Sequence, residues 1–196
     1  MPITNDPTDQ RRQRRSIRLQ GYDYSRAGAY YITICTRDRQ CLLGKVVDGK
    51  TQLNEAGNIV QTVWEGLPQF YGGVELDAFI VMPNHVHGVI VILAGVGAIR
   101  KSRLPSKRSA SVRITDRRRM LLSKIIGRFK MASAKRVNDL RQTTGSAVWQ
   151  RNYYEHVVRD EESLNRIRQY IIDNPAQWDF DRENPAVGAI HESPLR

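Results

Sequence analysis

Cysteine and long hydrophobic runs are scarce in this sequence. The 196 residues include only Cys35 and Cys41, too few for a disulfide framework and without a second pair to form a zinc site. The longest apolar run, residues 88–98, is shorter than the roughly 20 residues that a membrane helix needs, so we expect no membrane-spanning role. Residues 1–20 hold five arginines and no apolar stretch typical of a secretory signal. These absences favour an intracellular, cytoplasmic protein with reduced thiols.

Acidic residues are scarce in one part of the chain. The whole sequence has 31 Lys and Arg against 20 Asp and Glu, a net charge of +11. Residues 100–141 hold 15 basic and two acidic residues, which leaves 16 basic and 18 acidic residues elsewhere. Such a block is typical of a surface that binds nucleic acid, because phosphate contacts release counterions. The alternative is a solvated helix face beside a basic loop, although opposite charges are normally interspersed there.

The composition and the hydrophobic pattern indicate a globular α+β protein. With 40% hydrophobic and 26% charged residues, the chain is neither fibrous nor disordered. β-Branched and aromatic residues predict strands at 29–36, 74–82, 85–93 and 147–158. Helical spacing predicts helices at 53–71, 116–140 and 160–174. The first six elements follow the split βαβ, ferredoxin-like order, in which an antiparallel sheet carries two helices on one face, and a C-terminal helix follows.

Two histidines, His85 and His87, stand in the predicted strand 85–93. Residues two apart on a strand project from the same face, so the imidazoles would lie side by side. Imidazole is a common ligand of divalent metals, and the pair could form half of a metal site. The alternative is a packed pair whose polar atoms are satisfied internally. We expect Val86 to pack on the opposite face of the sheet and to hold the strand in place.

Tyr170 and Asn174 lie four residues apart on the predicted final helix and therefore share a face. A phenol hydroxyl and an amide oxygen could then point at one centre, with Asn174 completing a metal site built on the two histidines. The alternative is that Tyr170 is a core aromatic residue and that Asn174 caps the helix.

These residues belong to three motifs that occur in a fixed order. The motifs are Met82-Pro83-Asn84-His85-Val86-His87, then Val148-Trp149-Gln150 with Tyr153-Tyr154-Glu155-His156, then Tyr170-Ile171-Ile172-Asp173-Asn174-Pro175. Together they resemble the single-tyrosine HUH transposases of the IS200/IS605 type, and most of all the REP-associated tyrosine transposases. The resemblance covers about residues 21–178. We therefore expect a basic arm at 1–20, a transposase-like domain at 21–178 and a tail at 179–196.

The resemblance implies roles for the residues that carry it. His85, His87 and Asn174 would hold Mg²⁺ or Mn²⁺, and Tyr170 would attack single-stranded DNA to give a 5′-phosphotyrosine link and a free 3′-hydroxyl. The insertion-sequence members commonly have Gln at the position of Asn174. The implied protein is a DNA transposase and endonuclease that binds hairpin or palindromic repeat DNA, as a monomer or a homodimer. Such an exchange of phosphodiesters needs no ATP, and no Walker-type loop is present.

Basic and aromatic residues are the candidates for DNA contacts. They are Arg11, Arg12, Arg14, Arg15, Arg117, Arg118, Arg119, Lys124, Arg128 and Lys130, with Tyr153, Tyr154 and Trp149 as rings on which bases could stack. His156 could be a competing ligand or the acid that protonates the leaving group. Two alternatives share these features. One is a non-catalytic hairpin DNA- or RNA-binding protein of the same fold, and the other is a metal-dependent ribonuclease or phosphodiesterase that uses water and forms no adduct.

Overall fold

Four strands form an antiparallel sheet in a computed structural model, which describes residues 22–94, 120–181, 183–185 and 187. The elements are β1 (Gly28–Cys35), β2 (Gly44–Val47), β3 (Lys50–Leu53), α1 (Glu55–Glu65), β4 (Val74–Val81), β5 (His85–Ile92), α3 (Leu121–Arg141), β6 (Tyr154–Val158) and α4 (Glu161–Asp173). The strand order is β4-β5-β1-β6, with every neighbouring pair antiparallel. This is the predicted ferredoxin-like order, and the predicted fold class is confirmed.

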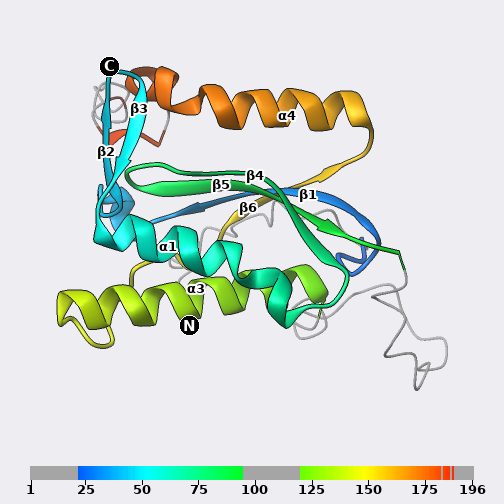
Figure 1. Ribbon diagram of the computed structural model, residues 1–196, viewed down its shortest axis with the longest axis horizontal. Coiled ribbons are helices and arrows are strands. Elements are labelled where there is room, and N and C mark those ends of the chain that lie inside the picture. The colour runs from blue at the N-terminus through cyan, green and yellow to red at the C-terminus, as the bar shows by residue number, and fades with distance from the viewer. Residues whose placement is uncertain (1–21, 95–119, 182, 186, 188–196) are drawn as a thin grey trace, which may run out of the picture.

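The sheet separates two helical layers, with α1 and α3 on one face and α4 on the other (Figure 1). Alternation along β5 assigns side chains to these layers. Val86 is fully buried in the core beneath α1 and α3, as predicted, whereas Val89 packs in a smaller core with Ile171 of α4. His85 and His87 are in phase with Val89, so their imidazoles lie on the α4 face.

A tryptophan of α1 sets the distance between α1 and the sheet. The Trp64 ring stacks on Phe79 of β4 with centroids 4.5 Å apart. A Cβ atom on Gly88 of β5 would lie 2.5 Å from the Trp64 ring, so glycine is the residue that lets the indole lie against the sheet. This packing supports β5 from the side opposite to the histidines.

A bulge in β4 anchors α4. The β4–β5 register shifts between Leu76 and Phe79, and the bulged segment contains Asp77. The Asp77 carboxylate accepts two hydrogen bonds from Arg168 of α4, at 2.9 and 2.7 Å. Bulges commonly re-aim a side chain in this way. The paired charges hold the helix that carries Tyr170 against the sheet.

Some predicted boundaries differ from the structure. The predicted helix 53–71 is divided into α1 and a short 3-10 helix, Leu67–Phe70, which has Pro68 in its first turn. Of the predicted strand 147–158, only Tyr154–Val158 pairs within the sheet as β6. The preceding loop is held by Lys130, whose Nζ donates to the carbonyl groups of Gln150 and Arg151. The hairpin of β2 and β3, which turns at Asp48 and Gly49, was not predicted.

Two further expectations concern the start of the basic helix and membrane-spanning segments. The predicted start of the basic helix, residue 116, lies outside the described residues, within which α3 begins at Leu121. In the described part of the chain, no helix is both long and apolar enough to cross a membrane.

Candidate metal and nucleophile site

The two histidines of β5 turn the same ring nitrogen toward one point. Their Nε2 atoms are 3.0 Å apart, and His85 and His87 are 0% and 3% exposed. Two ligands of one ion, each at about 2.1 Å, are about 3 Å apart when they subtend a right angle. The spacing therefore suits a shared metal ion.

The other ring nitrogens bind neighbouring side chains. His85 Nδ1 lies 2.8 Å from Oδ1 of Asn84, and His87 Nδ1 lies 2.8 Å from the Tyr31 hydroxyl and 2.9 Å from that of Thr33. All of these oxygens can accept an N–H group, which leaves the Nε2 lone pairs available. Burial lowers the pKa of both histidines, and for His87 a charge on His85 lowers the pKa further. Burial thus favours the neutral form of both rings, which is the form that binds metals.

Two buried oxygen atoms complete the group. Asp181 Oδ2 lies 3.8 Å from His85 Nε2, and ligand atoms of His85, His87 and Asp181 all lie within 4.8 Å of one another. Asn174 is 2% exposed. Within the described part of the chain, neither Asp181 Oδ2 nor Asn174 Oδ1 accepts a hydrogen bond. Buried oxygens normally have partners, so two imidazoles and two such oxygens fit a divalent cation.

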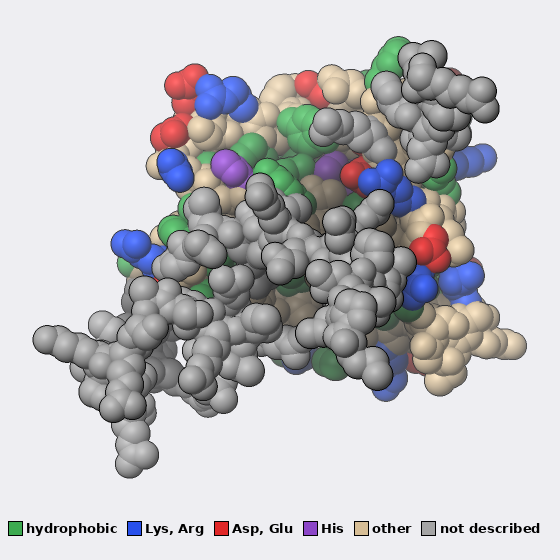
Figure 2. Space-filling model, turned by 180° about the vertical axis from the view of Figure 1, so that it is seen from behind, with side chains coloured by type: hydrophobic (Ala, Val, Ile, Leu, Met, Phe, Trp, Pro, Cys, Tyr) green, Lys and Arg blue, Asp and Glu red, His purple; other side chains and the backbone are tan. Residues whose placement is uncertain are grey.

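Tyr170 stands at the edge of this group. Its ring is 5.3 Å from the His87 ring and 6.4 Å from the Tyr31 ring, between centroids, and the residue is 43% exposed. Tyr170, Asn174 and His87 line one pocket of about 510 Å³. On the face seen from behind, a histidine side chain is visible within a hollow beside an acidic side chain (Figure 2). The predicted nucleophile is thus both exposed and adjacent to the histidines.

Sequence reasoning missed two acidic residues of the pocket, Asp181 and Glu183. They follow a 3-10 helix, Asn174–Phe180, and stand in the segment assigned to the tail. Glu183 forms an ion pair with Arg39 at 2.9 Å and accepts a hydrogen bond from the Cys35 thiol at 3.2 Å. These contacts hold the segment after the 3-10 helix against the end of β1. Acidic residues alternate with other residues after Pro175, and this pattern is the sequence feature that could have suggested a site. Their spacing does not indicate, however, that they lie near the histidines.

Other predicted residues are distributed over both faces. Arg11, Arg12, Arg14, Arg15, Arg117, Arg118 and Arg119 lie outside the described residues. Tyr154 lines the pocket, whereas Trp149 is 6% exposed, donates to Ser133 and belongs to the core. Tyr153 packs partly buried against the same core. His156 is exposed on β6, opposite Tyr31 in the register, and does not line the pocket.

Helix α3, which carries Lys124, Arg128 and Lys130, lies on the face of the sheet opposite to α4 (Figure 1). Lys124 is exposed, and the Arg128 guanidinium lies 3.4 Å from the centre of the Phe70 ring. The Lys130 ammonium group donates hydrogen bonds to carbonyl groups of the loop before β6, and burial lowers the pKa of Lys130 to about 8. A DNA contact by these three residues stays a prediction.

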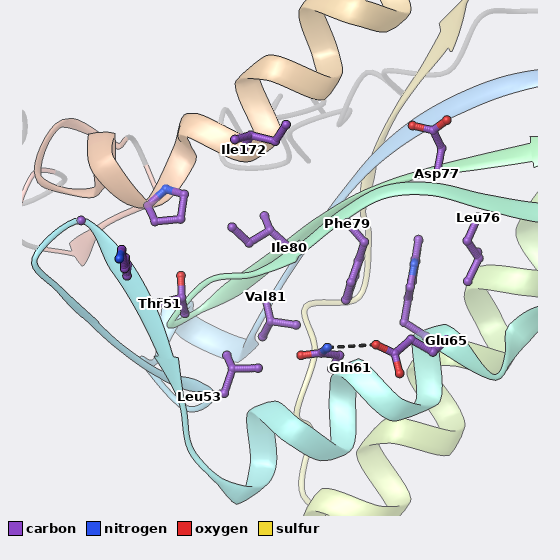
Figure 3. Close-up of a pocket in the computed structure, with 14 residues that line it drawn as sticks. Thr51, Leu53, Gln61, Glu65, Leu76, Asp77, Phe79, Ile80, Val81 and Ile172 are labelled. Carbon is purple, nitrogen blue, oxygen red and sulfur yellow. Dashed lines mark hydrogen bonds between the residues drawn. The ribbon is translucent and has the colours of Figure 1, made fainter.

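A second cleft, of about 570 Å³, lies between α1, β4 and the end of α4. Figure 3 shows its lining, with Ile172 above, Phe79 and Val81 along the strand, and Gln61 bonded to Glu65 on α1. It contains none of the histidines and does not include Tyr170. The residues predicted to act in catalysis therefore lie at the smaller pocket, which contains His87, Tyr170 and Asn174.

Comparisons with known proteins agree with this architecture. No protein-family model matches the chain. The chain is 40% identical over 176 residues to a Haemophilus influenzae protein named "Uncharacterized protein", covering 86% of this chain and 92% of that one. It is 24% identical over 160 residues to a second protein of that species, named "Putative REP-associated tyrosine transposase", covering 81% and 76%.

A solved structure of a REP-associated tyrosine transposase bound to a REP hairpin has a similar fold. Its TM-score is 0.52 at 15% identity, over 82% of this chain and 73% of that one. The predicted resemblance is thus confirmed at the level of the fold. Since 40% identity over most of both sequences shows common descent, the chain belongs to one family with the uncharacterized Haemophilus influenzae protein, and it shares its fold with a REP-associated tyrosine transposase.

Proposed function

We propose that this chain is a metal-dependent tyrosine transposase, a single-stranded DNA endonuclease and strand transferase that acts on hairpin or palindromic repeat DNA. One observation supports this function above all. Two separated motifs meet in one place, where His87 of β5 lies 5.3 Å from the Tyr170 ring of α4 and shares a pocket with Asn174. A merely structural histidine pair would not require an exposed tyrosine beside it.

We assign His85, His87, Asn174 and Asp181 as the residues that would hold Mg²⁺ or Mn²⁺. A bound divalent cation would polarise the scissile phosphate and offset its charge. The sequence motifs suggested the first three residues, and the buried Asp181 Oδ2 atom adds the carboxylate that hard cations prefer.

Tyr170 is the proposed nucleophile. Its phenolic oxygen forms a bond to phosphorus while the bond from phosphorus to the 3′ oxygen breaks, which leaves a 5′-phosphotyrosine and a 3′-hydroxyl. Because Tyr170 is 43% exposed, its proton can pass to water, and the 3′ oxygen takes a proton in turn. A later attack by a 3′-hydroxyl reverses the exchange, so strands are rejoined without a nucleotide cofactor.

One chain can supply every residue of the proposed site. The Tyr170 ring of α4 lies beside His87, and Arg168 of the same helix binds Asp77 of β4. A monomer would therefore hold a complete site, whether or not a dimer forms.

The proposed partner is DNA with a hairpin. The fold neighbour was solved bound to a REP hairpin. The basic block at residues 100–141 offers phosphate contacts to a stem. The sequence-predicted arginines and lysines are retained as candidates for this role.

A trapping assay tests the proposal. A labelled hairpin with single-stranded flanks, incubated with Mn²⁺, should give a denaturant-resistant protein–DNA adduct. Tyr170→Phe should abolish the adduct while DNA binding persists, and chelation of the metal should do the same. Tyr71→Phe is the matched control, because its hydroxyl binds a backbone carbonyl on the α3 side. An adduct with Tyr170→Phe would refute the nucleophile, and DNA hydrolysis without any adduct would favour a water-using phosphodiesterase.

A further inference from the structure

The 3-10 helix after α4 presents a row of side chains to the pocket. Residues three apart are eclipsed in a 3-10 helix and follow each other at about 6 Å along its axis. Asn174, Gln177 and Phe180 form such a row, and all three line the pocket of Tyr170. The row passes from Asn174, which is 2% exposed, to Phe180, which is 83% exposed. It therefore leads from the proposed metal group to the rim.

Phe180 is the most exposed of the large hydrophobic side chains in the described residues, at 83%. Phe70, the other exposed phenylalanine, has the Arg128 guanidinium 3.4 Å above its ring. Phe180 lines a pocket together with three tyrosines and several polar side chains, and concave sites of this composition commonly bind ligands. An aromatic ring there offers a platform on which an unpaired base can stack.

The charges around Phe180 favour a base over a phosphate. Asp179, which is exposed, precedes it in the sequence, whereas the neighbouring Asp181 is assigned to the cation and Glu183 is paired with Arg39. A phosphate beside the Asp179 carboxylate would be repelled, whereas an uncharged base would not. Gln177 is exposed one turn before Phe180, and its amide offers both donors and an acceptor to a base edge.

We propose that Phe180 and Gln177 form a subsite for one nucleotide next to the scissile phosphate, whose unpaired base stacks on Phe180 and hydrogen-bonds to Gln177. This subsite rests on the proposed function, because it places the neighbouring phosphate near Tyr170. It gives the site a protein contact to a single-stranded flank, separate from any contact of the basic block with a hairpin stem.

Binding measurements in the Tyr170→Phe background test the subsite without cleavage. The probe is a hairpin whose single-stranded flank carries 2-aminopurine at each position in turn. One position should show fluorescence quenching by stacking that is lost in Phe180→Ala and kept in Phe180→Tyr. Phe180→Ala should weaken binding of the flank about 5- to 150-fold, as expected for one stacked base. Gln177→Ala should reduce discrimination among bases at that position.

Ile172→Ala is the matched control, since Ile172 is a 65% exposed hydrophobic residue of α4 that lines the other cleft. It should leave binding and quenching unchanged. The subsite would be overturned if Phe180→Ala bound the hairpin as tightly as its parent and changed the quenching at no flank position. This holds even if Tyr170 forms the adduct. Phe180-dependent quenching without any adduct would support the subsite and refute the transposase chemistry, and failure to bind any such DNA would refute both.

Discussion

Asn84, the residue before the histidine motif, connects three segments of the site. It is 0% exposed, and its Nδ2 donates to the backbone carbonyls of Arg39 and Glu183. Its Oδ1 lies 2.8 Å from His85 Nδ1. One side chain thus ties the turn after β1 and the segment after α4 to the first histidine, and we predict that Asn84→Ala damages both stability and metal binding.

The expected loss follows from these contacts. The change removes three hydrogen bonds and leaves their buried partners unsatisfied. At about 1 kcal/mol for each bond, the free energy of unfolding should fall by about 3 kcal/mol. For a chain of this size that is a fall in melting temperature of about 6–12 °C. Because the oxygen that orients His85 is also lost, Mn²⁺ affinity should fall about 10- to 100-fold.

Urea denaturation and Mn²⁺ titration calorimetry measure the two effects. Asn54→Ala is a suitable control, because the Asn54 side chain makes two hydrogen bonds but caps α1 away from the histidines. It should cost about 1 kcal/mol of stability and leave Mn²⁺ affinity unchanged. If Asn84→Ala were within about 0.5 kcal/mol of the parent and bound Mn²⁺ equally well, the reasoning about this side chain would be refuted.

Further predictions concern the packing, the α4 anchor and the thiols. Gly88→Ala should destabilise the protein by about 1–3 kcal/mol in urea, because its Cβ would lie 2.5 Å from the buried indole, whereas Gly127→Ala, with open space around it, should not. The Arg168 guanidinium lowers the pKa of Asp77 below 3.8, so this stabilisation is complete above pH 3.8 and is lost as the pH falls through the lower folded-state value. The stability difference between wild type and Asp77→Asn should therefore shrink on acidification, and a constant difference would contradict the pairing. Burial raises the pKa of Cys35 to about 12, so iodoacetamide at mild alkaline pH should label exposed Cys41 and spare Cys35 until unfolding, as mass spectrometry can show.

The sheet and the pairing of the motifs were predictable because local patterns determine them. Alternation along residues 85–93 placed His85 and His87 on one face, and the α4 face is where the structure has them. The four-residue spacing on a helix placed Tyr170 and Asn174 together, and both line the same pocket.

The features that the sequence did not predict depend on contacts between distant segments. The β2–β3 hairpin is short and rich in polar residues, so its strands carry little periodic signal. Residues 147–153 have the composition of a strand, but Lys130 and a single bridge from Thr36 to Trp149 hold them as a loop. Asp181 reaches the histidines only because a 3-10 helix follows α4, a turn that the residue types around Pro175 do not specify.

The central claim is that Tyr170 becomes covalently attached to DNA in a metal-dependent step. The most direct measurement is peptide mapping by mass spectrometry after incubation of the protein with hairpin DNA and Mn²⁺ and digestion of the DNA. The account predicts a nucleotide linked through its 5′-phosphate to the Tyr170 side chain, absent when the metal is chelated. A modification on Tyr154 or on another residue, or the same yield without metal, would contradict it.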